Sequence, residues 1–406
     1  MKKKTVCVIG LGYIGLPTAT LLAHKGYSVS GVDVDEEIVK NINKGQIHII
    51  EEDLDELVKS VIISGNLVAF KSVKLSDVYI ICVPTPFHDD TEIPRPNIDY
   101  VLSAVKDIAP LIKAGDLIIL ESTSPVGTTK KIQETLIECG SDIKELNIAY
   151  CPERVLPGKI MKELITNDRI IGGLTPISTK KAADFYRQFV EGDIIETDAK
   201  TAEMCKLTEN SFRDLNIAFA NELSMICEKQ EINVWDLIKM ANKHPRVNIL
   251  QPGTGVGGHC ISVDPWFIIY QDRENSTLIQ TARQVNIKKT RWVLDKIKNN
   301  INSYFEKKKA KPKIVCLGLT FKPDVQDARE SQALKVAETL LKEGYDVKCV
   351  DSHIKKSTQL SMLNFSEALD WADIFCILVK HSEFVTFEAK SKLKDKIILD
   401  FCGLYA

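Results

Sequence analysis

The residue with the greatest chemical potential is a cysteine in a glycine-rich loop that runs from Gly255 to Pro265. Cys260 lies four residues before Asp264, and the surrounding glycines would let a substrate approach the backbone closely. A thiolate can attack a carbonyl carbon and hold an acyl group while water enters. A single cysteine is more often structural than nucleophilic, so this loop alone leaves both interpretations open.

A second group of residues indicates that the chain binds a dinucleotide. Gly10, Gly12 and Gly15 follow an apolar strand-like run and open a helix-like stretch. Glycines at this spacing permit a tight turn and bring a pyrophosphate close to the N–H groups of a helix N-terminus. Asp33, at the end of the next strand, can bind the adenosine ribose and would repel a 2′-phosphate. The pattern favours NAD over NADP, and with Cys260 it predicts oxidation of an alcohol through to an acid.

Further candidate binding residues follow the ends of predicted strands. They are Pro84 and Thr85, the run Ser122–Thr128 that contains Thr123, and Glu153. Ligands of open α/β sheets bind at this edge. The first two segments are equally compatible with ordinary turns.

The elements that must position these groups form three regions. Strands and helices alternate through roughly the first 190 residues, long helical stretches are predicted at 200–243 and 276–308, and a strand-and-helix rhythm returns from 313 to 400. Lys206 and Asn210 lie four residues apart on the first long stretch and so share a face, although a surface salt bridge is the usual role of such a lysine.

The fold class is therefore predicted to be α/β, with two Rossmann-like doubly wound domains joined by a central helical dimerisation region. The expected boundaries are 1–195, 196–308 and 309–406.

Composition narrows the functional class. The 406 residues carry a net charge of -2, which gives no general affinity for nucleic acid. The eleven cysteines form no CxxC pair and no zinc-like cluster with histidine, so no metal is expected. The N-terminus has no signal-peptide pattern and no run approaches the roughly 18 apolar residues of a membrane span. A cytoplasmic protein without a membrane partner is expected.

Taken together, these segments resemble the UDP-glucose/GDP-mannose dehydrogenase family over essentially the whole chain. The matching motifs appear in the family's order: the glycine fingerprint, Pro84–Pro86, Ser122–Thr128, Lys206 with Glu209 and Asn210, Gly257–Cys260 with Asp264, and Phe321–Pro323 with Asp327–Ser331. Within the family, the segments 151–158, 201–214 and 244–253 resemble the branch that oxidises UDP-N-acetyl-D-mannosamine.

Two positions depart from the UDP-glucose branch of that family. His259 stands where that branch usually has serine, and Pro157 stands where it has a second glutamate. These departures argue against UDP-glucose as the substrate. They also leave the base that hydrolyses a thioester unassigned.

The resemblance implies two successive oxidations of a sugar C6 hydroxyl by two NAD⁺, which would make a uronate precursor of surface polysaccharide. Lys206 would stabilise the alkoxide and Asn210 would hydrogen-bond the same oxygen. Cys260 would form a thiohemiacetal and then a thioester, and Asp264 would activate water with help from Glu153 and Thr123.

The same resemblance implies the remaining site residues. Those expected to hold the cofactor are Gly10, Gly12, Tyr13, Ile14, Gly15, Asp33, Pro84, Thr85, Thr123 and Arg329. Those expected to hold the UDP-N-acetylhexosamine substrate are Glu153, Arg154, Val155, Lys206, Asn210, Arg213, Arg246, Asn248, Gly257 and Lys322. Arg246 would reach the neighbouring subunit's site in a homodimer.

Two alternatives remain open on the sequence. One is the gluco epimer, UDP-N-acetyl-D-glucosamine, since C2 epimers differ only in where one amide points. The other is a non-catalytic nucleotide-sugar-binding paralogue. A decayed paralogue would be expected to lose its thiol or the partners of that thiol, whereas Cys260, Lys206, Asn210 and Asp264 are all present.

Overall fold

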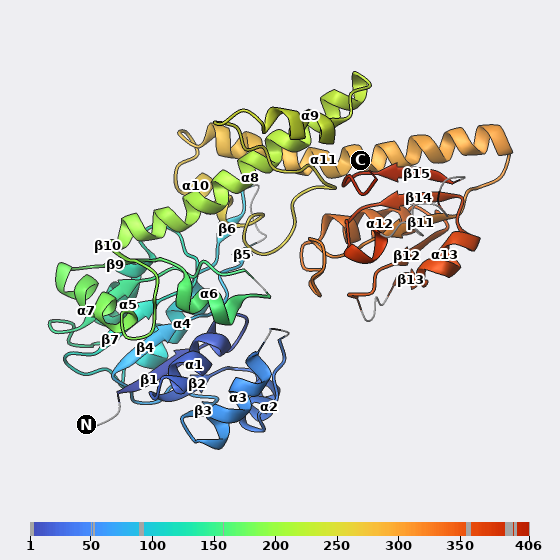
Figure 1. Cartoon of the computed structure of the whole chain (residues 1–406). Coiled ribbons are helices and arrows are strands. Elements are labelled where there is room, and N and C mark those ends of the chain that lie inside the picture. Colours follow the sequence, from blue (N-terminus) through green and yellow to red (C-terminus); the bar gives the residue numbers. More distant parts are fainter. Residues whose placement is uncertain are drawn as a thin grey trace. The chain divides into compact units, whose positions relative to one another are not determined.

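The structure is a computed structural model that describes residues 4–49, 51, 53–88, 93–156, 158–354, 359–385, 393 and 396–405. Pro157 therefore lies outside the described residues. The chain divides into two compact units (Figure 1). The first unit contains the residues up to Thr208 together with Trp266–Gln271, and the second contains Glu209–Pro265 together with the residues from Asp272 onward.

An eight-stranded sheet forms the first unit, in the order β10-β9-β8-β7-β4-β1-β2-β3. Six strands run parallel, as predicted, but β9 pairs antiparallel with β8. Strand β10 pairs parallel with β9, so it also runs against the other six. The sequence did not predict this reversal. The strands are β1 (Thr5–Ile9), β2 (Ser28–Val32), β3 (Leu67–Phe70), β4 (Val78–Ile81), β7 (Leu117–Leu120), β8 (Asn147–Tyr150), β9 (Arg169–Gly173) and β10 (Ile194–Asp198), with a small hairpin of β5 (Phe87–His88) and β6 (Arg95–Pro96).

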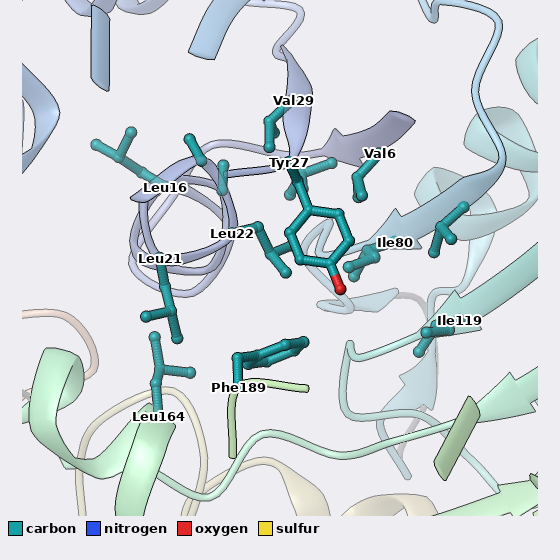
Figure 2. Packing of buried hydrophobic residues seen from close by; sticks show 14 of the residues in the cluster. Val6, Leu16, Leu21, Leu22, Tyr27, Val29, Ile80, Ile119, Leu164 and Phe189 are labelled. Atoms are coloured by element: carbon teal, nitrogen blue, oxygen red, sulfur yellow. The ribbon is translucent and has the colours of Figure 1, made fainter. Parts of the chain in front are cut away.

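Both faces of this sheet are buried. Side chains of β1 alternate between two apolar clusters, with Val6 and Val8 in one and Cys7 and Ile9 in the other. Figure 2 shows the first cluster, in which Leu22 of α1 and Tyr27 lie close to Ile80. The helices are α1 (Gly15–His24), α2 (Glu36–Asn43), α3 (Leu54–Ile63), α4 (Asp99–Ile108), α5 (Thr128–Glu138), α6 (Ile160–Thr166) and α7 (Pro176–Tyr186).

The second unit contains a five-stranded parallel sheet in the order β13-β12-β11-β14-β15. Its central strand also alternates between two clusters, with Ile314 and Cys316 on one face and Val315 and Leu317 on the other. The elements are β11 (Ile314–Leu317), α12 (Gln332–Lys342), β12 (Val347–Val350), β13 (Ser361–Met362), α13 (Phe365–Trp371), β14 (Ile374–Ile377), a short 3₁₀ helix (Ser382–Phe384) and β15 (Ile397–Asp400).

The middle of the chain contains two long helices, α8 (Ala199–Lys229) and α11 (Thr277–Lys308), and two short ones, α9 (Val234–Ala241) and α10 (Asp264–Gln271). The expectation of one helix through 200–243 was wrong. Glu231 has a positive φ of 57° and Asn233 caps α9 by accepting hydrogen bonds from the N–H groups of Trp235 and Asp236. An asparagine cap competes with helix continuation, and this ends α8 early.

No helix in the described part of the chain is both long and apolar enough to cross a membrane.

Candidate active site

The glycine turn after β1 is shaped by steric limits. A Cβ on Gly15 would lie 1.7 Å from the carbonyl oxygen of Gly10, whereas a Cβ on Gly12 would meet no atom within 4 Å. The backbone therefore requires glycine at position 15 for its own packing. At position 12 the open space is on the side from which a ligand could approach, and this fits a dinucleotide pyrophosphate.

Asp33 lies beside this turn, at the end of β2. Its Oδ2 accepts a hydrogen bond from the Leu11 N–H at 2.9 Å, and its Oδ1 accepts one from the Asp35 N–H at 3.0 Å. Both bonds fix the carboxylate next to the glycine turn. Each oxygen keeps a second lone pair with which it could accept from a ribose hydroxyl.

The loops that follow β4 and β7 are joined by hydrogen bonds. The Thr85 hydroxyl donates to the Thr123 carbonyl at 2.6 Å, and the Ser122 hydroxyl donates to the Val83 carbonyl at 2.7 Å. Thr85 and Thr123, both predicted for the cofactor site, are thus neighbours at the carboxyl edge of the sheet. Pro84 lies between Val83 and Thr85 in the same loop.

Glu203, which sequence reasoning did not single out, fixes the second of these loops to α8. Its two carboxylate oxygens accept hydrogen bonds from the Gly127 N–H at 2.6 Å and from the N–H and hydroxyl of Thr129 at 2.7 and 2.6 Å. Burial raises the pKa of Glu203, while these hydrogen bonds oppose that shift. Lys206 follows one turn later on α8, so the clamp also fixes the start of the helix that carries it.

Gln271 makes a second clamp on the same loop. Its amide nitrogen donates to the Val126 carbonyl at 2.7 Å, and its amide oxygen accepts from the Val126 N–H at 3.2 Å. The loop between β7 and α5 is therefore held from α8 and from the end of α10.

Glu153 lies in a buried ionic network. Its side chain is 8% exposed, and its oxygens accept from Arg169 at 2.9 Å and from the Arg154 N–H at 2.6 Å. The carboxylate thereby joins the end of β8 to the start of β9. The sequence predicted a catalytic role for Glu153 but not this structural one. Arg154 also donates to the Asp168 carbonyl at 3.2 Å, and Val155 packs against the apolar cluster of Figure 2.

The network extends to a second acid. Glu121 accepts hydrogen bonds from the Tyr186 hydroxyl at 2.6 Å and from the Cys82 thiol at 3.3 Å, and burial raises its pKa. Sequence reasoning missed Arg169 as well, although an arginine in an otherwise apolar strand is a signal of a buried ion pair.

In the second unit the structure joins three predicted catalytic residues. The Asn210 amide donates to the Asp264 carboxylate at 2.5 Å, and the Asp264 N–H donates to the Cys260 carbonyl at 2.9 Å. Asn210 and Asp264 are buried, whereas Cys260 is exposed. Cys7, Cys316 and Cys376 are buried, which is typical of cysteines that act as small apolar core residues, and Cys82 is half-buried.

The glycine loop packs against residues that follow β11. A Cβ on Gly257 would lie 2.4 Å from the Glu330 carbonyl oxygen, and the Gly258 N–H donates to the Arg329 carbonyl at 3.3 Å. Arg329 itself pairs with Asp327 at 2.6 Å. Burial and the Arg329 charge lower the pKa of His259, so the imidazole beside the thiol is neutral near pH 7.

Charged groups influence Lys322 in the second unit. Burial and the charge of Arg213 lower the pKa of Lys322, while Asp327 and Cys260 oppose that shift. Lys206 belongs to the first unit and is half-buried.

The predicted loop residues Arg246 and Asn248 are exposed. This loop is anchored to α8, because the Asn216 amide donates to the Asn248 carbonyl at 3.1 Å and accepts from the Leu250 N–H at 3.0 Å.

One cluster with metal-ligand chemistry was not predicted. Asp324, His353 and His381 bring potential ligand atoms within 4.8 Å of one another. Both nitrogens of His381 are already engaged, since Nδ1 accepts from the Asp324 N–H at 3.0 Å and Nε2 lies 3.2 Å from the Asp351 carboxylate. The cluster is therefore explained by hydrogen bonds that join the ends of β12 and β14.

The chain belongs to the UDP-glucose/GDP-mannose dehydrogenase family. It matches that family's NAD binding domain over residues 4–190, its central domain over 200–288 and its UDP binding domain over 315–406. The family resemblance, the α/β fold class and the NAD cofactor expected from the sequence are thereby confirmed, and the chain is an NAD-dependent oxidoreductase.

Curated relatives cover the chain from end to end. It is 50% identical to the UDP-N-acetyl-D-mannosamine dehydrogenase of Campylobacter jejuni over 98% of both chains, and 50% identical to the protein of that name in Escherichia coli K12 over 100% of both. It is 46% identical to the NDP-N-acetyl-D-galactosaminuronic acid dehydrogenase of Ralstonia nicotianae, over 99% of this chain and 96% of the relative.

Solved structures agree in fold. The UDP-D-ManNAc dehydrogenase of Pyrococcus horikoshii superposes with a TM-score of 0.89 at 37% identity, covering 99% of this chain and 96% of that one. The UDP-N-acetyl-mannosamine dehydrogenase of Staphylococcus aureus gives a TM-score of 0.88 at 42% identity, covering 98% and 95%.

The two glycines of the turn should respond differently to alanine. Gly15→Ala should lower the thermal unfolding midpoint because the new Cβ collides with backbone, a clash that costs at least about 1–3 kcal/mol. Gly12→Ala should unfold like the wild type but bind NAD at least about tenfold more weakly, a loss of about 1.4 kcal/mol. Calorimetric unfolding and NAD titration measure the two effects. Wild-type NAD affinity in Gly12→Ala would show that the pyrophosphate does not approach there.

Proposed function

We propose that this enzyme oxidises UDP-N-acetyl-D-mannosamine at C6 to the carboxylate, with two NAD⁺ per sugar. The observation that carries the proposal is the arrangement in which Asn210 holds Asp264 at 2.5 Å and Asp264 binds the backbone of Cys260. A four-electron alcohol oxidation needs a reactive thiol and a fixed carboxylate, because the second oxidation must end in hydrolysis. The names of the relatives at 50% identity support the sugar.

The chemistry divides among the chain's own residues. Two NAD⁺, bound one after the other, would each accept one hydride. In the first oxidation the C6 hydroxyl loses its proton, and Lys206 and Asn210 stabilise the oxygen as charge develops on it. The Cys260 thiolate then adds to the aldehyde carbon and forms a thiohemiacetal. Covalent capture keeps the reactive aldehyde from escaping.

The second oxidation converts the thiohemiacetal into a thioester with loss of a hydride and a proton. Water attacks the thioester carbon, the carbon–sulfur bond breaks, and the Cys260 thiolate and the sugar carboxylate are released. Asp264 takes one proton from that water, since it follows Cys260 by one helical turn and is fixed by Asn210. The second proton passes to solvent. Arg213 and Lys322 supply positive charge for the diphosphate of the substrate.

Glu153 and Thr123 assist Asp264 in activating the water, and each lies in a loop that hydrogen bonds hold in place. The buried pair with Arg169 fixes Glu153, and the Thr123 carbonyl is held by Thr85. Arg154 and Val155 extend the Glu153 loop, and Gly257 lets the thiol loop approach its neighbours. Tyr13 and Ile14 complete the glycine turn, and Arg329 is proposed for the cofactor. The three domain boundaries, 1–195, 196–308 and 309–406, are kept as part of this proposal.

The relative from Ralstonia favours one second candidate, a galacto-configured N-acetylhexosamine. Substrate preference separates the candidates. The purified enzyme should form two NADH per UDP-N-acetyl-D-mannosamine consumed, with kcat/KM at least about tenfold higher than for the gluco and galacto isomers or for UDP-glucose. NADH absorbance with end-point product analysis measures both quantities. Faster turnover of another isomer would overturn the choice of sugar, and one NADH per sugar would overturn the four-electron reaction.

We further propose a homodimer in the cytoplasm. Phe212, Phe219 and Ile226 are exposed at seven-residue intervals on α8, which places a continuous apolar stripe on one side of that helix. A second copy of the stripe is a suitable cover, and it would bring the exposed loop of Arg246 to a neighbouring subunit. Cysteines without a disulfide-like spacing suit a reducing compartment.

Sedimentation equilibrium tests the dimer. The wild type should give twice the 45.5 kDa chain mass, and Phe219→Glu should shift it toward a single chain because a charge in an apolar interface is costly. Ile63→Glu, a change at an exposed isoleucine of α3, is the control and should stay dimeric. A monomeric wild type contradicts the proposal.

A further inference from the structure

A cavity of about 260 Å³ lies within the second unit. None of the residues that line it belongs to the cysteine loop. Residues of α8, α9, α11 and the end of β15 line it. Its walls are largely apolar and aromatic, and include Val234, Trp235, Trp292, Ile398 and Phe401. Its volume is close to the lower end of small-molecule sites.

A buried lysine lies in this cavity. Lys289 of α11 is 2% exposed, its ammonium donates to the Ser224 hydroxyl at 2.7 Å, and its Nζ lies 3.8 Å from the centre of the Trp292 ring. An ammonium has three donors, and among the described residues Ser224 is the one hydrogen-bond acceptor of this group. Burial lowers the pKa of Lys289 to about 7.

The charges that share the cavity do not compensate Lys289. Glu228 pairs with Lys296, and Asp400 lines the cavity next to Phe401. No ion pair joins Lys289 to a carboxylate in the described part of the chain. A buried cation without an anion is costly, and an anionic ligand in the cavity would offset that cost.

The ring of Trp235 forms part of the aromatic wall of the cavity. Its indole Nε1 is buried, and a Cβ on Gly403 would lie 2.2 Å from this nitrogen, so the ring is closely packed on that side. Trp235 therefore contributes an aromatic surface to the cavity.

We propose that this cavity is a second binding site, which takes a small aromatic carboxylate of about ten non-hydrogen atoms, with its carboxylate bound by Lys289 and its ring between the aromatic walls. Negative charge on the ligand compensates the ammonium, and the carboxylate supplies an acceptor for the N–H groups of Lys289 that Ser224 leaves over. The apolar body covers Val234, Ile398 and Phe401. The site does not depend on the proposed sugar chemistry, since none of its residues belongs to the cysteine site.

Phenylacetate is the probe, and 2-phenylethanol is its uncharged counterpart. Isothermal titration calorimetry on the full chain should show saturable binding of phenylacetate at pH 6.5 and at least about tenfold weaker binding of the alcohol. Lys289→Met should lose at least about tenfold in phenylacetate affinity, whereas Lys288→Met, a change at the exposed neighbour, should bind like the wild type.

The pH dependence gives an independent readout. Because the ligand pairs with the charged form, wild-type affinity should fall at least about tenfold between pH 6.5 and pH 9. Glu228, Lys296 and Asp400 also line the cavity, and Lys289→Met keeps all three. Its affinity should therefore be flat over the same range. No saturable binding, equal binding of acid and alcohol, or undiminished binding by Lys289→Met would each overturn the proposal and indicate a water-filled cavity.

Discussion

Three hydrogen bonds to the Glu203 carboxylate fix the start of helix α8 to the large sheet. They join the N-terminus of α5 and its preceding loop to α8, at the carboxyl edge of that sheet. A helix N-terminus carries unpaired N–H groups and partial positive charge, so a buried carboxylate is a favourable partner. Lys206 lies one turn after Glu203, so this contact also fixes the turn of α8 that carries Lys206.

One face of helix α8 carries buried polar side chains along much of its length. Glu203, Asn210, Asp214, Asn221 and Ser224 recur at spacings of three, four or seven residues, and each is buried and hydrogen-bonded. Asp214 accepts from Arg283 at 2.6 Å and Asn221 donates to Asn286 at 2.9 Å, so α11 is held through specific pairs. Specific polar pairs fix the register of two long helices more strictly than apolar packing does. The same face of α8 therefore binds the loop before α5 through Glu203, carries the predicted site residue Asn210, and contacts α11 through Asp214 and Asn221.

The sequence predicted features that depend on local pattern. The glycine turn, Asp33 at the end of β2 and α12 at Gln332–Lys342 all follow from residue type and spacing within a few turns of chain. Asn210 and Asp264 were assigned to one site by resemblance, and the structure places their side chains 2.5 Å apart.

Features that depend on pairing between distant segments were not predictable in this way. The antiparallel pairing of β9 with β8 cannot be predicted from the spacing of apolar residues. A strand that is buried on both faces is apolar whichever way it runs. The ion pair of Glu153 with Arg169 and the cavity around Lys289 likewise arise where separate segments meet. The early end of α8 could have been read from Asn233, a strong capping residue inside an otherwise helical stretch.

The central claim is that Cys260 carries the sugar as a thioester. Rapid acid quench during turnover with UDP-N-acetyl-D-mannosamine and NAD⁺, followed by mass spectrometry of the peptide that contains Cys260, tests it most directly. A fraction of this peptide should carry the mass of the acyl group, and Asp264→Asn should raise that fraction because hydrolysis slows. Complete oxidation with an unmodified Cys260 peptide at every quench time, in both the wild type and Asp264→Asn, would contradict the account.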